Sequence, residues 1–163
     1  MNIQIKRSAL LAVFLIAACG QQQGPAPAEA LAAAPPAGVS GAAVDVCALL
    51  DSADALPAVG KLYKPPEARP AQGSLLGQCE YFGDKLVLMV SARPAAEYRG
   101  TVDYAAKKGG SKPMAGLGSA ADMTPMGLMI QPAGQPYFIV VYTMAGGKFD
   151  EATALDIGRK LKL

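Results

Sequence analysis

The chain has 163 residues, among them 15 Lys or Arg and 13 Asp or Glu, and it contains no histidine and no tryptophan. Without histidine, the chain has no Ser-His-Asp or Cys-His catalytic set and no histidine ligand for zinc. Lys6 and Arg7 lie in the N-terminal segment, so the rest of the chain is balanced at 13 basic and 13 acidic residues. No basic run remains that would follow a phosphate backbone, so we expect no nucleic-acid partner.

Residues 1–18 have the layout of a bacterial signal peptide. The two basic residues are followed by an apolar run from Ala9 to Ala18, which is shorter than the roughly 20 residues of a permanent membrane span. The run ends in Ile16-Ala17-Ala18-Cys19, which resembles the lipobox of bacterial lipoproteins. This resemblance implies cleavage between Ala18 and Cys19 and a lipid on the Cys19 thiol. The alternative is an ordinary secretory signal in which Cys19 is incidental.

A lipidated Cys19 would tie the chain to a membrane, because each buried acyl methylene contributes about 0.8 kcal/mol. Gly20 follows the cysteine, and by the same resemblance this favours the outer membrane facing the periplasm in a Gram-negative cell. Residues 19–44 are rich in Ala, Pro, Gly and Gln, with no aromatic residue and one charge, Glu29. We therefore predict a flexible linker over 19–44 and a globular domain over 45–163.

The first half of this domain predicts a short helix and a β-hairpin. Asp51 and Ser52 are suited to cap a helix that Gly60 ends, and residues 61–76 predict an irregular segment because they are rich in proline and glycine. Strands are expected over 78–82 and 85–92, with a two-residue turn at Gly83-Asp84. The apolar run 86–90 does not alternate with polar residues, so we expect the second strand to be central and covered on both faces.

The second half predicts two helices and further strands. Pro94 is expected to open a helix that reaches Lys108 and ends at Gly109-Gly110. Residues 112–123 predict a turn flanked by short strands, and two more strands follow over 127–131 and 137–143. Asp150 is placed to cap a C-terminal helix. Mostly antiparallel connections then predict a single small α+β domain, an antiparallel sheet flanked by helices.

Cys47 and Cys79 are the cysteines that remain after lipidation. A lipobox directs the chain out of the reducing cytosol, so we expect a structural disulfide between them. A redox-active pair is the alternative, but the sequence has no Cys-x-x-Cys motif and no histidine to activate a thiol.

Three short motifs of the domain occur together: Asp45-x-Cys47-Ala-Leu-Leu50, Cys79 with Tyr81, and Gly116-Leu-Gly118-x-x-Ala121. In this combination the chain resembles a broad family of small bacterial lipoproteins of unknown function, best known from actinobacteria. The resemblance implies an antiparallel sheet flanked by helices and a bond between the two cysteines. It implies no catalytic residue.

Met123-Thr-Pro-Met126-Gly-Leu-Met129 places three thioethers at a spacing of three residues. This pattern resembles the methionine motifs of periplasmic copper-handling proteins, and soft sulfur ligands suit Cu(I). The alternative is that these methionines fill the core or an exposed turn.

Taken together, the sequence predicts a non-catalytic, lipid-anchored cell-envelope protein. It would bind a protein partner or an apolar envelope ligand and would need no cofactor. Two alternatives stay open: a periplasmic Cu(I)-binding protein that uses Met123, Met126 and Met129, and an inhibitor of an envelope-targeted toxin. We expect no enzyme activity, because the usual catalytic sets are missing and no two carboxylates are identifiable as an acid/base pair.

Overall fold

The structure is a computed structural model and describes residues 41–163. Its elements in chain order are the 3-10 helix η1 (Val46–Leu49), α1 (Ser52–Val59), β1 (Glu67–Arg69), β2 (Gly77–Phe82), β3 (Val87–Pro94), the 3-10 helix η2 (Ala95–Glu97), α2 (Tyr98–Gly109), β4 (Lys112–Pro113), β5 (Ala120–Thr124), β6 (Gly127–Gln131), β7 (Tyr137–Ala145), β8 (Lys148–Phe149) and α3 (Glu151–Lys160). The predicted signal peptide, the Cys19 lipidation site and most of the linker lie outside the described residues.

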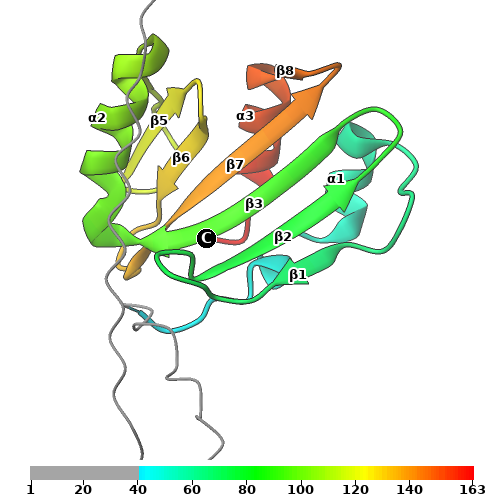
Figure 1. Cartoon of the computed structure of the whole chain (residues 1–163), viewed down its shortest axis with the longest axis horizontal. Helices are drawn as coiled ribbons and strands as arrows, with labels where there is room; N and C mark the ends of the chain where they lie inside the picture. Colours follow the sequence, from blue (N-terminus) through cyan, green and yellow to red (C-terminus); the bar gives the residue numbers. More distant parts are fainter. Residues whose placement is uncertain (1–40) are drawn as a thin grey trace, which may run out of the picture. The chain divides into compact units, whose positions relative to one another are not determined.

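The described residues form one α+β domain around an eight-stranded antiparallel sheet, as predicted (Figure 1). The strands lie in the order β1, β2, β3, β7, β6, β5, β4, and β8 pairs with β7. The long strand β7 is therefore central: it joins the β2–β3 hairpin to the β5–β6 hairpin.

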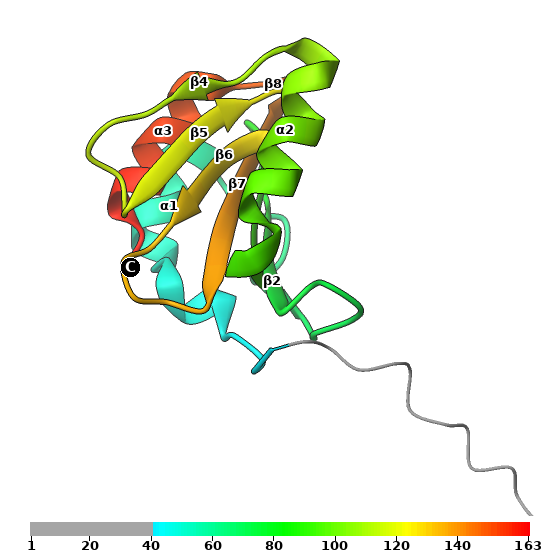
Figure 2. The same ribbon diagram turned by 90° about the vertical axis from the view of Figure 1, so that its left-hand side faces the viewer.

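The two faces of the sheet are covered unequally. Helices α1 and α3 pack on one face, where their apolar side chains share a core with Leu88, Val90 and Val141. Helix α2 lies on the opposite face and packs over Met129 and Phe138, toward the β5–β6 side (Figures 1 and 2). Among the described residues, no helix covers the α2 face of β1, β2 and β3 (Figure 1).

This arrangement corrects the prediction for the second hairpin strand. β3 is central, between β2 and β7, as expected. However, only one face is fully covered: Leu88 and Val90 are buried, whereas Met89 and Ser91 are half-buried. An apolar run fits a strand with one open face here because the open face is itself partly apolar.

Other boundaries differ from the expected ones for local reasons. The turn between β2 and β3 contains four residues, because Phe82 pairs with Val87. Pro94 ends β3, so α2 begins only at Tyr98, after η2. The segment expected to be irregular contains β1, an edge strand paired with β2.

The end of α1 and the start of α3 lie where their capping residues predict. Gly60 ends α1 with a φ of 76°, a left-handed value that glycine adopts without strain. Asp150 caps α3 by accepting a hydrogen bond from the Thr153 amide at 3.1 Å, and this bond lowers the pKa of the Asp150 carboxyl. The predicted side-chain cap of α1 is absent: Asp51 makes no capping hydrogen bond, and its Oδ2 accepts from Lys162 Nζ at 2.7 Å.

The expected disulfide joins Cys47 of η1 to Cys79 of β2, which confirms the prediction. Cys79 is fully buried in the core that the sheet shares with α1 and α3. The bond fastens the start of the domain to the first hairpin strand.

Candidate functional site

A groove of about 720 Å³ lies between α2 and the open half of the sheet. We call it the α2 groove; its walls are formed by Gln78, Met89, Ser91, Arg93, Glu97, Gly100, Thr101, Tyr104, Met126, Met129, Val140 and Tyr142. Its volume falls within the range of about 300–1,000 Å³ that is usual for small-molecule sites. It is therefore large enough for an organic ligand.

The floor of the α2 groove is apolar because of the strand register. Side chains two apart along a strand point to the same face, and directly paired residues lie side by side. Met89 pairs with Tyr142, and Met129 pairs with Val140. These four side chains therefore form one continuous apolar surface across β3, β7 and β6.

The helical wall contains a glycine at a position that favours almost any other residue. Gly100 lies inside α2, where glycine costs about 1 kcal/mol relative to alanine. A Cβ built on Gly100 would meet nothing within 4 Å, so packing does not require the glycine. Its lack of a side chain keeps the groove wide, and a local penalty without a packing reason is typical of functional positions.

Two exposed apolar side chains border the same groove. Tyr104 on α2 is 55% exposed, and Met126 in the β5–β6 turn is 42% exposed. Large exposed apolar side chains are unremarkable singly, but here they continue the apolar floor. The apolar surface thus extends out of the groove toward solvent at the C-terminal end of α2.

Helix α2 is anchored firmly to the sheet beside the groove. The Tyr98 hydroxyl donates to Asp122 at 2.7 Å, and the Tyr98 ring meets the Phe138 ring edge-on at 5.5 Å between centroids. Burial, followed by the hydrogen bond to Asp122 and the charge of that carboxylate, raises the pKa of Tyr98. The hydroxyl therefore stays protonated and acts as a structural donor, so α2 forms a fixed wall.

The other end of the groove is polar. Ser91 and Gln78 are paired residues of β3 and β2, and Arg93 follows on the same face. The Arg93 Nη1 donates to Ser74 Oγ at 3.2 Å and lies 3.9 Å from Glu97 Oε2. Both members of this ion pair are about two-fifths exposed, at 39% and 41%, so solvent screens their interaction.

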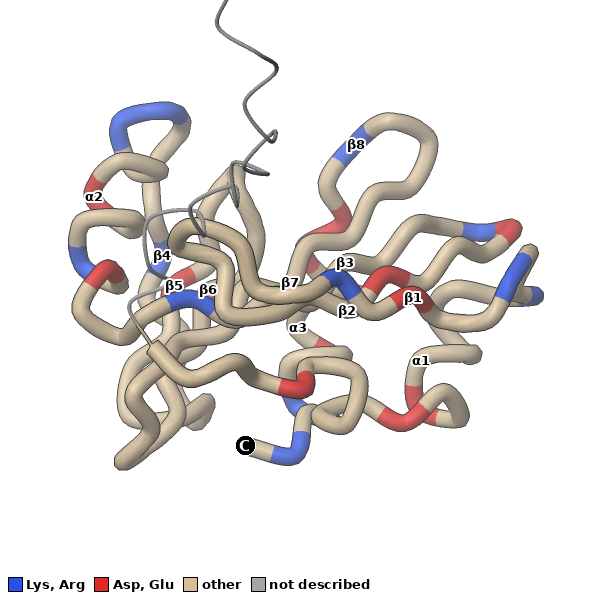
Figure 3. The backbone as a smooth tube through the Cα atoms, turned by 60° about the horizontal axis from the view of Figure 1, so that its bottom comes forward, with Lys and Arg blue, Asp and Glu red and all other residues tan. Residues whose placement is uncertain are grey.

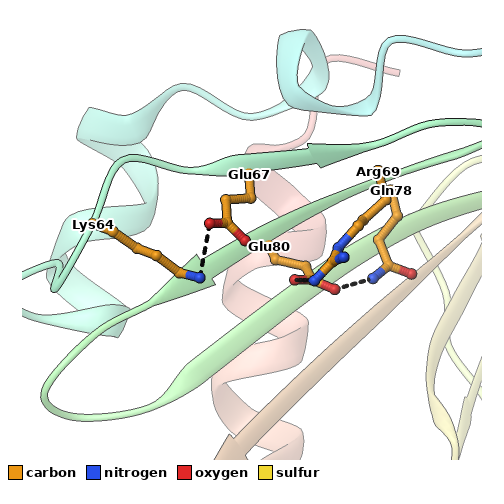
Figure 4. A network of polar contacts seen from close by, with 5 residues as sticks. All are labelled: Lys64, Glu67, Arg69, Gln78 and Glu80. Carbon is orange, nitrogen blue, oxygen red and sulfur yellow. Dashed lines mark hydrogen bonds and ion pairs between the residues drawn. The ribbon is translucent and has the colours of Figure 1, made fainter.

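A polar network on β1 and β2 continues from this end (Figure 4). Glu80 is buried and accepts from Arg69 Nη2 at 3.0 Å and from Gln78 Nε2 at 2.6 Å. Glu67 pairs with Lys64 at 2.8 Å, and this contact lowers the pKa of Glu67. The network fixes the Gln78 amide at the edge of the groove, and the buried carboxylate is paired rather than available for chemistry.

The three methionines of the predicted copper motif do not come together. Met123 pairs with Leu128 and belongs to the core beneath α3, whereas Met129 lies under α2 on the other face of the sheet. The sheet itself separates Met123 from Met129. Residues an even number of positions apart share a face only within one strand, and here the β5–β6 turn lies between the two methionines. The three methionines thus do not form the Cu(I) ligand set that the motif suggested as an alternative, although Met126 and Met129 both line the α2 groove, together with Met89.

Met126 and Met129 stand out in the sequence only as possible copper ligands, and the other residues of the groove were not predicted. Its walls come from segments distant in sequence, and only the sheet order brings them together. Gly100, a glycine inside a predicted helix, is the one local feature that could have indicated the groove, and it was not singled out. In the described part of the chain, no three acidic or cysteine side chains gather where they could hold a metal ion.

Among residues 41–163, no helix has both the length and the apolar character needed to cross a membrane. Acidic and basic positions are spread over the described elements, with both signs on α2 (Figure 3). Comparisons with protein-family models, with curated proteins and with solved structures give no match for this chain.

Proposed function

We propose that this chain is a lipid-anchored cell-envelope protein that binds an apolar ligand in the α2 groove and catalyses no reaction. The observation that carries this proposal is the groove itself: an apolar floor of Met89, Met129, Val140 and Tyr142 left open between a fixed helix and the sheet. Methionine and aromatic side chains suit such a site, because they offer apolar surface that adapts to a ligand.

The anchor part of the proposal rests on the lipobox. An acylated Cys19 would hold the chain at the outer membrane, facing the periplasm. The linker over 19–44 has a root-mean-square span of about 25–30 Å if it is flexible. The groove would then stay close to the membrane surface, where apolar ligands are concentrated.

The remaining alternatives have weaker support. A Cu(I) site of Met123, Met126 and Met129 is disfavoured because Met123 and Met129 lie on opposite faces of the sheet. Inhibition of an envelope-targeted toxin would need a partner surface, and the described surface gives no specific sign of one. A protein partner that inserts apolar side chains into the α2 groove is the closest competitor.

Filling the groove from Gly100 tests the proposed site. We expect Gly100→Phe to weaken binding of 1-N-phenylnaphthylamine, an uncharged dye that fluoresces in apolar surroundings, by at least about tenfold, or ~1.4 kcal/mol. Apart from the neighbouring residues and the backbone of α2 itself, nothing lies within 4 Å of the added Cβ, so the new side chain starts in open space beside the groove. The measurement is a fluorescence titration of the chain from Gly20 to Leu163, which contains every described element and carries no lipid.

Asp103→Phe is the matched control, since it adds the same ring to the exposed surface of α2 outside the groove. It should bind the dye as the native chain does. Equal melting temperatures of the variants would show that the fold is retained. No dye binding to the native chain, or equal binding to the Gly100→Phe chain, would contradict the proposed site.

Replacing Cys19 tests the anchor separately. Cys19→Ser removes the thiol that would carry the lipid, so we expect uncleaved precursor and no incorporation of labelled palmitate. Cell fractionation and the mass of the purified chain measure both effects. A native chain cleaved before Cys19 but carrying no lipid would overturn the anchor.

A further inference from the structure

Building on the proposed function, we propose that the ligand of the α2 groove is a single-chain amphiphile with a zwitterionic phosphate–ammonium head, of the lysophospholipid type. Its head would lie at Arg93 and Glu97, and its alkyl chain would lie over Met89 and Tyr142 toward Met126. Two features of the groove carry this inference: the change from polar to apolar along its length, and the charges of Arg93 and Glu97 at its polar end, which we call the mouth.

The groove changes from polar to apolar in one direction along both walls. On β3, Arg93 lies near the C-terminal end of the strand, and Ser91 and then Met89 lie progressively farther from that end. Along α2, Glu97 stands at the start and Tyr104 two turns later. Because β3 leads directly into η2 and α2, which runs back along the sheet, the two polar ends coincide (Figure 1).

The dimensions suit one extended chain. From Arg93 to Met89 the strand rises about 13 Å, and from Glu97 to Tyr104 the helix rises about 10 Å. The groove volume of about 720 Å³ surrounds this path, which opens to solvent at Met126. A ligand with a polar head and one apolar tail therefore matches the groove at both ends.

The charges at the mouth favour a zwitterion. Arg93 and Glu97 face each other across 3.9 Å and remain two-fifths exposed, so their mutual contact is weak and each is open to a further partner. A guanidinium binds phosphate through paired hydrogen bonds, and a carboxylate attracts an ammonium group. A purely anionic head would meet the Glu97 carboxylate, and a purely cationic head would meet Arg93.

The other charges nearby do not disturb this balance. Arg69 and Glu80 pair with each other at 3.0 Å beside the mouth. Lys108 lies 5.6 Å from the centre of the Tyr104 ring, at the far end of the helix. Gln78 and Ser91 complete the polar end without adding charge.

The test compares four decyl amphiphiles as competitors for the bound dye, each below the concentration at which it forms micelles. They carry a phosphocholine, a sulfate, a trimethylammonium or a maltoside head. We expect decylphosphocholine to displace 1-N-phenylnaphthylamine at a concentration at least about tenfold lower than any of the others. From octyl to dodecyl phosphocholine, binding should tighten by up to about fourfold for each methylene.

Two variants locate the head. Arg93→Gln and Glu97→Gln should each remove most of the preference for the phosphocholine head over the uncharged maltoside head. The preference is the ratio of the two displacing concentrations measured on the same variant, so any change in dye affinity cancels. Arg99→Gln, on the exposed side of α2, should retain the preference. Thermal unfolding of each variant controls for folding.

The outcomes separate this inference from the proposed function. Equal displacement by all four heads, or a preference that survives in both the Arg93→Gln and the Glu97→Gln chains, would overturn the amphiphile. Dye binding blocked by Gly100→Phe would still support the groove as a ligand site. Displacement by none of the amphiphiles would also overturn the inference and favour a polypeptide segment as the occupant.

Discussion

Replacing both Cys47 and Cys79 with alanine should lower the free energy of unfolding by about 3–4 kcal/mol. The bond links η1 to β2 across a sequence separation of 32 residues. Closing a loop of this length removes conformational entropy from the unfolded chain by about this amount. Since small domains are stable by only about 5–15 kcal/mol, much of the stability of this domain would be lost.

Urea unfolding of the chain from Gly20 to Leu163 measures this effect. The native chain in reducing buffer is the control, because it keeps both sulfur atoms while losing the bond. The reduced chain and the double variant should unfold at similar urea concentrations, well below the oxidised chain. An oxidised and a reduced chain with the same midpoint would show that the disulfide does not stabilise the fold.

Phe138→Ala should destabilise the domain by about 3–5 kcal/mol and should also weaken dye binding in the α2 groove. Phe138 is fully buried, and its ring supports Tyr98 at the start of α2. Removing a buried aromatic ring loses its transfer free energy and leaves a cavity. Because α2 forms one wall of the groove, a loosened helix would no longer present a fixed site.

Phe138→Leu is the matched control, since leucine keeps an apolar side chain beneath α2 and should cost less than the alanine variant. Urea unfolding measures stability, and titration with 1-N-phenylnaphthylamine measures the groove. A strong loss of stability in Phe138→Ala without any loss of dye binding would show that the groove does not depend on the position of α2. A loss of stability below about 1 kcal/mol would contradict the packing role itself.

Short-range signals in the sequence were enough to locate most elements. Gly60 and Asp150 set the end of α1 and the start of α3, because capping depends on a few adjacent residues. The strand β7 and the β2–β3 hairpin were also predicted, because β-propensity and turn residues likewise act over a few adjacent positions. The compartment that the lipobox implies and the cysteine count were enough to predict the Cys47–Cys79 bond, since only two thiols remain if Cys19 carries a lipid.

The sequence was insufficient where a side chain's surroundings come from distant segments. The apolar run 86–90 predicted a strand covered on both faces, but only the position of α2 decides how far the second face is covered. The methionine spacing left a copper site open as an alternative to a role in the core or in a turn, whereas the β5–β6 pairing places Met123 and Met129 on opposite faces. In both cases the sequence pattern is the same for either outcome.

The sequence alone determined the α+β class, the pairing of Cys47 with Cys79 and most element positions, and the proposed lipid anchor at Cys19 rests on the sequence alone. The tertiary structure decided that β3 pairs with β7 and that α2 covers only the β5–β6 side of the sheet face on which it lies. It also decided that Gly100 borders a groove. The physical reason is range: caps, turns and periodicity act over a few residues. The α2 groove instead requires side chains from Gln78 to Tyr142 to meet, and only the pairing of distant strands brings them together.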